Sequence, residues 1–351
     1  MKFIHTADVH LGSQLNLKTT IEKINERRAE IRATFKNVVE LAKSENATAI
    51  ILSGDVFDGE RALKKDKEFF YNVVKNNPTI DFLYLRGNHD ILEGFEENYP
   101  NLKLFNDSWT YYEYGDIVIA GIEISSVNAN SFYQSLNLSE GKTNIVMLHG
   151  QVADSMGNGL INVVKLKDKN IDYLALGHVH SNKIGKIDER GVYAYSGCPE
   201  GRGFDETGKK GVYLLNVENS KVDSVFINTA KRDISFVSVD CTGLNGVYEV
   251  YSRIKEIGKL SANNIYRIEL YGEVDFDTEG IEDDLTKYLD SECYLTSIKD
   301  RTVRKIDIES LSGDLSLKGE FLRKVIESDI SEEDKKRIIS LGLKALSGRD
   351  I

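Results

Sequence analysis

Short apolar runs of strand length recur through the first two thirds of this 351-residue sequence, and they restrict the fold more than any other feature. Each run holds four to six residues, a length that suits a buried β-strand better than a helix. The runs lie at 49–52, 82–85, 117–122, 145–148, 173–176, 192–195 and 212–217. The first two thirds of the chain are therefore predicted to be rich in buried strands.

Two segments with helical periodicity lie between the first of these predicted strands. Apolar residues from Ile21 to Ala42 form a stripe beside Glu, Lys and Arg positions, and a second helix is predicted over about 61–76. After Asp116 helices become scarce and Gly-rich turns separate the strands, so we expect parallel order to give way to hairpin-connected strands. The predicted fold class is α/β, with two stacked β-sheets flanked by helices.

A second domain is predicted to begin near Lys231. Strand-like and amphipathic segments alternate there in the order β-α-β-α-β, at 236–239, 246–258, 264–270, 279–290 and 293–298. Two short helices are expected between about 318 and 346, the second entered through Ser331 as N-cap with an acidic first turn. The predicted division is a main domain at 1–230, a small α+β capping domain at 231–312 and a C-terminal helical tail at 313–351.

Composition narrows the class of protein further. There are 45 Lys and Arg against 56 Asp and Glu, a net charge of −11, which argues against a basic surface for non-specific nucleic-acid binding but not against a polyanionic substrate. Cys198, Cys241 and Cys293 are too widely spaced for a disulfide framework or a CxxC metal site. With no apolar signal segment at the start and no apolar run of about 18 residues, we expect a cytoplasmic protein without a membrane partner.

Five of the six histidines stand at the ends of apolar runs, beside Gly, Asp or Asn. In chain order the clusters are Asp8-Val9-His10, Gly54-Asp55-Val56-Phe57-Asp58, Gly87-Asn88-His89-Asp90, His149-Gly150 and Gly177-His178-Val179-His180. Taken alone, each cluster is more often a turn than a site, because Asp and Gly are common turn residues. Strand carboxyl ends, however, are where open α/β sheets place ligand sites, so all five together favour one crevice.

The residue types in these clusters indicate metal binding. Asp carboxylates, neutral imidazoles and an Asn carbonyl suit Mn²⁺, Fe²⁺ or Zn²⁺, and the lack of thiolates argues against a structural zinc site. One ion would need about four to six such groups, and seven are offered, so two ions are expected. Two ions that share a carboxylate activate water and stabilise in-line displacement at phosphorus. Phosphoester hydrolysis is therefore the predicted reaction.

The motifs D-x-H, G-D-x-x-D, G-N-H-D, H-G and G-H-x-H, in that order, resemble the calcineurin-like metallophosphoesterase superfamily. The resemblance implies two divalent ions, Mn²⁺ first, with Mg²⁺, Fe²⁺ or Zn²⁺ as alternatives. It also implies the ligands: Asp8, His10, Asp55 and His180 for one ion, and Asp55, Asn88, His149 and His178 for the other, with Asp55 bridging. His89 would be the catalytic histidine beside the scissile phosphate, and Asp58 would orient and support it.

Segments outside the ligand motifs resemble one branch of that superfamily, the SbcD-like and YhaO-like DNA repair exonucleases. These segments are 5–12, 53–58, 195–206, 264–270, 299–302 and 316–321, so the likeness covers nearly the whole chain. It implies an Mn²⁺-dependent hydrolase that digests DNA from its ends. The implied partners are DNA and an SbcC-type coiled-coil ATPase docked on the helices near 318–346, and a homodimer is left open.

The Gly-rich segment 197–211 carries one more candidate. Arg202 could contact phosphate oxygens beside the metal ions, or it could pin the loop, and the residues alone favour neither.

Two other functions are compatible with the same site residues. One is a phosphodiesterase or phosphatase for nucleotides or other small esters, because fold does not choose the substrate within a superfamily. The other is a DNA-end-binding subunit that regulates a partner ATPase and whose hydrolysis is incidental. The likeness of the C-terminal third to the exonucleases favours DNA over small esters, and the complete ligand set counts against the regulatory subunit.

Overall fold

The computed structural model describes residues 1–13, 15, 19–59, 64–90, 99–305 and 315–346. By its contacts the chain divides into two compact units. The first unit holds Met1–Val237, Lys259–Ile268 and Tyr288–Ser297, and the second holds Ser238–Gly258, Glu269–Lys287 and Ile298–Ile351. The predicted boundary near 231 stays a prediction, and the one near 312 lies outside the described residues.

The first sheet has the strand order β14-β13-β1-β2-β3-β4. Its strands are β1 (Lys2–Thr6), β2 (Ala49–Ser53), β3 (Asp81–Leu85), β4 (Leu102–Leu104), β13 (Gly211–Glu218) and β14 (Lys221–Asn228). β1 to β4 are parallel, with Phe3 opposite Ala49 and Ile50 opposite Phe82, whereas β13 is antiparallel to both β1 and β14. This sheet therefore presents the carboxyl ends of three long parallel strands at one edge.

The second sheet has the order β11-β12-β10-β7-β6-β5. Its strands are β5 (Thr110–Tyr114), β6 (Ile117–Gly121), β7 (Thr143–His149), β10 (Tyr173–Gly177), β11 (Lys183–Lys186) and β12 (Val192–Tyr195). The expectation of hairpins after Asp116 is wrong for most of this sheet, because β6, β7, β10 and β12 are all parallel. Only β5 with β6 and β11 with β12 pair as antiparallel neighbours within it. The crossovers between its parallel strands hold little helix, so no helical periodicity in these segments reveals them.

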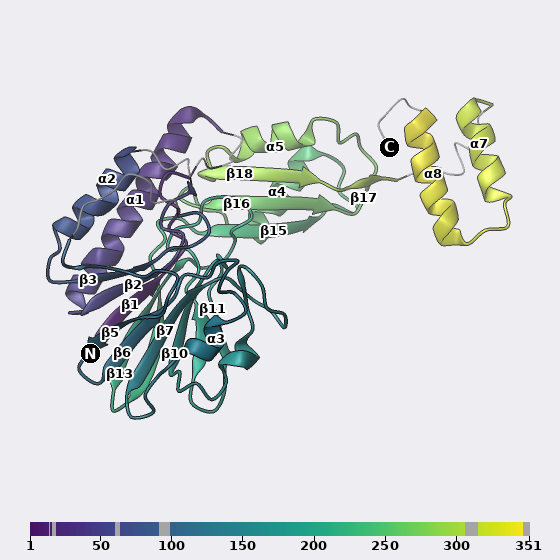
Figure 1. Cartoon of the computed structure of the whole chain (residues 1–351). Helices are drawn as coiled ribbons and strands as arrows, with labels where there is room; N and C mark the ends of the chain where they lie inside the picture. Colours follow the sequence, from purple (N-terminus) through teal and green to yellow (C-terminus); the bar gives the residue numbers. More distant parts are fainter. Residues whose placement is uncertain (14, 16–18, 60–63, 91–98, 306–314, 347–351) are drawn as a thin grey trace. The chain divides into compact units, whose positions relative to one another are not determined.

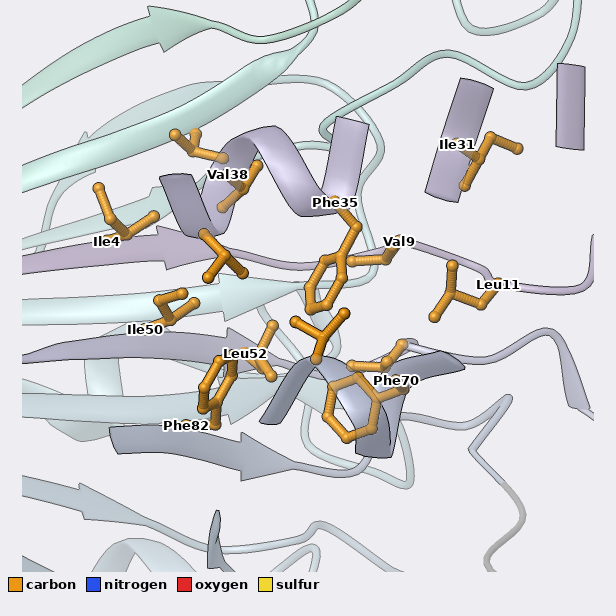
Figure 2. Close-up of a cluster of buried hydrophobic side chains, with 14 of the residues drawn as sticks. Ile4, Val9, Leu11, Ile31, Phe35, Val38, Ile50, Leu52, Phe70 and Phe82 are labelled. Atoms are coloured by element: carbon orange, nitrogen blue, oxygen red, sulfur yellow. The ribbon is translucent and has the colours of Figure 1, made fainter. Parts of the chain in front are cut away.

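Alternate residues of each central strand enter different cores, which explains why the runs are apolar throughout. Ala49 and Ile51 of β2 pack between the two sheets with residues such as Ile145 and Met147 of β7. Ile50 and Leu52 face the helices α1 (Ile21–Ser44) and α2 (Lys64–Lys75). Figure 2 shows that helix-facing core, where Phe35, Val38 and Phe70 lie over Ile50, Leu52 and Phe82.

A third core covers the outer face of the second sheet. Val146 and Leu148 of β7 pack there with Phe132 of α3 (Phe132–Ser135) and Leu166 of the 3-10 helix η2 (Val163–Leu166). The short parallel pair β8 (Gln151–Val152) and β9 (Leu160–Ile161) follows β7. The first unit is thus two sheets face to face with helices outside, which confirms the predicted fold class (Figure 1).

The last third of the chain has the predicted β-α-β-α-β order. Its elements are β15 (Ile234–Asp240), α4 (Val247–Gly258), β16 (Ile265–Tyr271), β17 (Glu273–Val274), α5 (Ile281–Leu289), β18 (Leu295–Asp300) and β19 (Val303–Arg304). β15, β16 and β18 form a three-stranded sheet in that order, and β17 pairs in parallel with β19. Three boundaries between the two units fall within these longer strands, and the other two fall at the end of α4 and within α5.

Two helices close the chain, α7 (Leu317–Ile326) and α8 (Glu332–Leu346), as predicted. They pack on each other through Leu322, Val325 and Ile339. The Ser331 hydroxyl accepts a 3.1 Å hydrogen bond from the Asp334 amide, so Ser331 caps α8 in the predicted way. Across the part of the chain that the structure describes, every helix is too short or too polar to cross a membrane.

Candidate metal centre

The predicted site residues follow the carboxyl ends of five strands in the first unit. Parallel strands of both sheets end at this edge: β1, β2 and β3 in one sheet, and β7 and β10 in the other. Two groups of predicted ligands gather there, Asp8 with His10 and His180, and Asp55 with His149 and His178, and a third group joins His10 to Asp58 and His89. In each group the candidate ligand atoms lie within 4.8 Å of one another. The strand ends therefore bring residues up to 172 positions apart into one centre.

Backbone geometry at these strand ends is unusual. Four ligand residues have positive φ angles, namely Asp8 (53°), His10 (48°), Asp55 (54°) and His178 (98°). Non-glycine residues in this region are strained, and such strain clusters at functional sites. Four of the seven predicted ligands therefore stand at positions with unusual backbone conformation.

Glycines stand before three of the ligands because there is no room for a side chain. A Cβ at Gly54 would collide with the His149 imidazole, and one at Gly87 would collide with the Asp55 carboxylate. At Gly177 it would meet the carbonyl of Ser53. The Gly of G-D, G-N and G-H is thus required by the close approach of the strands.

In the first group, the imidazoles of His10 and His180 face each other with 3.3 Å between their Nε2 atoms. The main-chain amide of His178 donates to both Asp8 oxygens, at 2.9 and 3.1 Å, and fixes that carboxylate. Two nitrogens bound to one ion at about 2.1 Å each lie roughly 3.0–3.4 Å apart. The observed spacing fits a shared divalent ion.

In the second group, His149 Nδ1 lies 2.9 Å from the Ser53 carbonyl, to which it must donate a hydrogen, since a carbonyl only accepts. In a neutral ring Nε2 would then carry the lone pair, yet it faces Asn88 Oδ1 at 3.0 Å and Asp55 Oδ2 at 3.4 Å. His178 Nδ1 approaches the same Asn88 oxygen at 3.2 Å. Several acceptors that face one another require a shared cation, so this donor set also fits a metal ion.

Asp55 connects the two groups. Its Oδ2 lies 3.4 Å from His149 Nε2 and 3.7 Å from His10 Nε2, while its Oδ1 accepts from the His89 amide at 2.8 Å. The carboxylate therefore stands where a ligand that bridges two ions would stand. Among the described residues, neither of the two groups includes a cysteine, in keeping with carboxylate and imidazole ligands for Mn²⁺-like ions.

Burial and charge act against each other in this centre. Burial alone raises the pKa of Asp8 and lowers that of His10. Burial would also raise the pKa of Asp55, but the hydrogen bond and charge of His149 hold it well below its usual range. Conversely, burial would lower the pKa of His149, but Asp55 raises it to about 9. In the absence of metal ions, a proton shared with His149 is thus the cation that compensates Asp55.

His89 and Asp58 stand beside the ligands. The His89 side chain is 47% exposed, and its Nδ1 lies 3.7 Å from Asp58 Oδ1. The same Asp58 oxygen lies 3.3 Å from His10 Nδ1, so Asp58 contacts a predicted ligand as well as the predicted catalytic histidine. The role of Asp58 toward His10 is one that the sequence interpretation missed.

A cleft of about 590 Å³ opens beside the second group. Asn88, His149 and His178 line its inner wall, with Gln151 and Asn158 beside them. A volume of this size is typical of small-ligand sites.

Arg202, the predicted substrate contact, lies on the other side of the centre. Its Nε and Nη2 donate to Glu206 at 2.9 and 2.6 Å, and Nη2 also lies 3.0 Å from His180 Nδ1. Its role in substrate binding stays a prediction, as do the ligand and catalytic roles of the other residues. The sequence interpretation assigned no role to Glu206, and its only signal was a carboxylate inside a Gly-rich segment.

Comparison with known proteins agrees with this centre. The family model described as calcineurin-like phosphoesterase matches residues 1–182, just over half of the 351-residue chain. The chain is 25% identical to the DNA double-strand break repair protein Mre11 of Sulfolobus acidocaldarius, over 99% of both chains.

Two bacterial relatives are similar over shorter stretches. The uncharacterized metallophosphoesterase YhaO of Bacillus subtilis is 29% identical over 73% of this chain and 67% of its own. A subunit of the SbcCD nuclease of Staphylococcus saprophyticus is 26% identical over 65% of this chain and 68% of its own. With its two sheets, its ligand groups and the match over residues 1–182, this chain belongs to the calcineurin-like phosphoesterase family.

Proposed function

We propose that this protein is an SbcD-like DNA exonuclease of DNA repair that uses two divalent metal ions, Mn²⁺ first among them. The observation that carries the proposal is the convergence of two donor groups on one shared carboxylate, that of Asp55. When bound, such ions supply Lewis-acid activation of water and charge stabilisation at phosphorus. Relatives named for double-strand break repair and for the SbcCD nuclease support DNA as the substrate.

His89 is the chain's own group for the reaction. Its amide is held by Asp55 and its Nδ1 faces Asp58, while nearly half of the side chain stays exposed. A phosphodiester can therefore reach a ring whose orientation is already restricted. From there His89 stabilises the developing charge or gives a proton to the leaving oxygen, work that typically contributes about 10²–10⁴-fold to a rate.

A second candidate, a phosphodiesterase for nucleotides or similar small esters, is favoured by one observation. The cleft beside Asn88, His149 and His178 has the volume of a small-ligand pocket. The chain's net charge of −11 also offers little for holding a long duplex, so the exonuclease proposal requires a partner that supplies basic surface.

We place the docking surface for an SbcC-type coiled-coil ATPase on α7 and α8. Apolar side chains stand exposed on and beside these helices, including Leu317 (70%), Ile338 (41%) and Leu341 (40%). A coiled-coil partner would cover such residues with its own apolar stripe. Ile338→Glu should abolish co-purification with the ATPase and leave hydrolysis by the isolated protein unchanged.

The deciding experiment compares two substrates. Metal-stripped protein is incubated with end-labelled linear DNA and with a chromogenic phosphodiester, each with Mn²⁺, Mg²⁺ or chelator. We expect Mn²⁺-dependent shortening of the DNA that His89→Ala largely removes. Cleavage of the small ester without DNA digestion would replace the proposal with the second candidate. Hydrolysis of neither substrate, together with retained stimulation of a partner ATPase, would favour a regulatory subunit.

A further inference from the structure

Side chains of the Gly-rich segment 197–211 surround one predicted metal ligand, His180. Glu206 Oε1 lies 2.8 Å from His180 Nδ1, and Arg202 Nη2 lies 3.0 Å from the same nitrogen. Lys210 Nζ donates to the His180 carbonyl at 2.7 Å, and Cys198 Sγ stands 3.6 Å from that carbonyl. The side chains at positions 198, 202, 206 and 210, each four residues after the last, thus contact the ring or the main chain of His180.

Two side chains compete for Nδ1 of the His180 ring. A carboxylate only accepts, so Glu206 at 2.8 Å favours a hydrogen on Nδ1, whereas the Arg202 guanidinium at 3.0 Å only donates and favours the opposite tautomer. The shorter contact is the one with Glu206, which places the hydrogen on Nδ1. The Nε2 lone pair of His180 then points at His10, 3.3 Å away. This is the tautomer that a metal ion bound at Nε2 requires.

Glu206 is itself fixed. It is only 6% exposed, and it accepts hydrogen bonds from Arg202 at the main-chain amide (2.6 Å), Nε (2.9 Å) and Nη2 (2.6 Å). A buried carboxylate with such partners stays ionised and has one orientation.

We infer that Glu206 is a positioning residue that sets the tautomer and orientation of His180 for metal binding, and that Arg202 acts through Glu206. The inference rests on the metal centre of the proposed function. His10 also has a carboxylate oxygen near its Nδ1, that of Asp58, but at 3.3 Å compared with 2.8 Å between Glu206 and His180. The inference also assigns Arg202 to the support of a ligand, a role that differs from both predicted alternatives, a contact with substrate phosphate and the pinning of the loop.

The first test measures Mn²⁺ binding to the metal-stripped protein by calorimetry. The wild type should bind two ions, and Glu206→Ala should weaken one site by about 10–100-fold and leave the other unchanged. Glu206→Gln keeps the shape and one acceptor oxygen, so it should fold even if Glu206→Ala does not, and should weaken the same site by a smaller factor. Asp172→Asn is the matched control, because Asp172 pairs with Arg190 through both oxygens.

A spectroscopic measurement keeps this inference separate from the proposed function. Nitrogen NMR of the imidazoles in the metal-free protein should show His180 protonated at Nδ1, and the Glu206 variants should shift it toward the other tautomer. If the wild type binds no Mn²⁺, the two-metal proposal fails while the NMR result still decides the role of Glu206. His180 protonated at Nε2 in the wild type, or both Mn²⁺ affinities unchanged in a folded Glu206→Gln variant, would overturn the inference.

Arg202→Met separates the two roles of that residue. If Arg202 acts through Glu206, the variant should lose Mn²⁺ affinity at the same single site as Glu206→Gln. A raised KM for DNA with unchanged Mn²⁺ affinity would contradict this part of the inference and support a direct contact with substrate.

Discussion

The two halves of the metal centre hold their histidines in different ways. His10 and His180 each have a carboxylate behind the ring, Asp58 at 3.3 Å and Glu206 at 2.8 Å. In the other half, His149 donates to a main-chain carbonyl, that of Ser53, at 2.9 Å. One half therefore depends on side chains from distant segments, whereas the other depends on the path of the backbone.

This difference determines which substitutions can weaken metal binding in one half and leave the other half intact. A side-chain carboxylate can be removed by one substitution without moving the chain, so the half with His10 and His180 can be weakened by itself. The Ser53 carbonyl belongs to β2 and cannot be removed by substitution, so the support that it gives to His149 is disturbed only by changing the backbone around it. Asp55 contacts a histidine ring of each half, and Asp8 of the first half also accepts from the main-chain amide of His178 in the second.

The largest effect is expected where the halves meet. Asp55→Asn removes the shared carboxylate charge and should lower Mn²⁺ content from two ions per chain to one or none, with hydrolysis reduced by at least about 10³-fold. Metal analysis by mass spectrometry and single-turnover hydrolysis measure the two quantities. Two tightly bound ions in this variant would mean that the halves are independent and that Asp55 does not bridge them.

His89→Ala should affect the rate and neither half's metal ion. The ring is exposed and belongs to neither of the two halves, so Mn²⁺ affinity should stay within about twofold while kcat falls by about 10²–10⁴-fold. Calorimetry and steady-state kinetics on the same preparation give both values. A loss of metal affinity equal to the loss of rate would instead place His89 among the ligands.

Gly54→Ala tests whether the backbone fixes the His149 half. Gly54 has φ +93°, and a Cβ there would collide with the His149 imidazole, so the variant should lose about 2–4 kcal/mol of stability and one metal ion. Gly115→Ala is its control, because Gly115 has φ +63° with nothing within 4 Å of an added Cβ. That control should cost about 1 kcal/mol and keep both ions. Equal losses of stability and metal in the two variants would contradict the collision.

The sequence predicted the centre because strand ends carry positional information. Asp8, Asn88 and His178 each follow an apolar run within a few residues, and parallel strands place such ends at one edge. The resemblance to a known superfamily then predicted ligand roles for these residues and a catalytic role for the neighbouring His89, and those roles stay predictions. The stacked sheets followed from the apolar runs, since strands buried on both faces need cover on both faces.

Three features of the fold and the centre were not predicted from the sequence. Two of them depend on segments with little regular secondary structure. Glu206 stands 26 residues from His180 in a loop whose path no periodicity describes, so its contact with the ring is visible only in the fold. The parallel order of β6, β7 and β10 was missed for a similar reason, because the described helices of these crossovers are α3 and η2, each of four residues. The Ser53 carbonyl could not be predicted, because any residue supplies a carbonyl.

His5 extends the comparison to a histidine outside both halves. It is fully buried between the sheets, with Nδ1 2.9 Å from the Tyr173 hydroxyl, and burial lowers its pKa to about 3. His149 is also buried, yet Asp55 raises its pKa to about 9, so the carboxylate decides the direction of the shift. A folded His5 thus stays neutral where the unfolded one is charged.

That contrast gives a pH dependence with a definite sign. Between the unfolded pKa of 6.5 and the folded value of about 3, the unfolded chain binds one more proton at His5, so the stability contribution falls as pH falls, by about 1.4 kcal/mol per pH unit. Urea unfolding of wild type and His5→Phe with chelator, at pH 7.5 and at steps down to pH 5, measures the difference in slope. The variant should lose less stability on acidification, and identical slopes would mean that His5 is charged inside the fold.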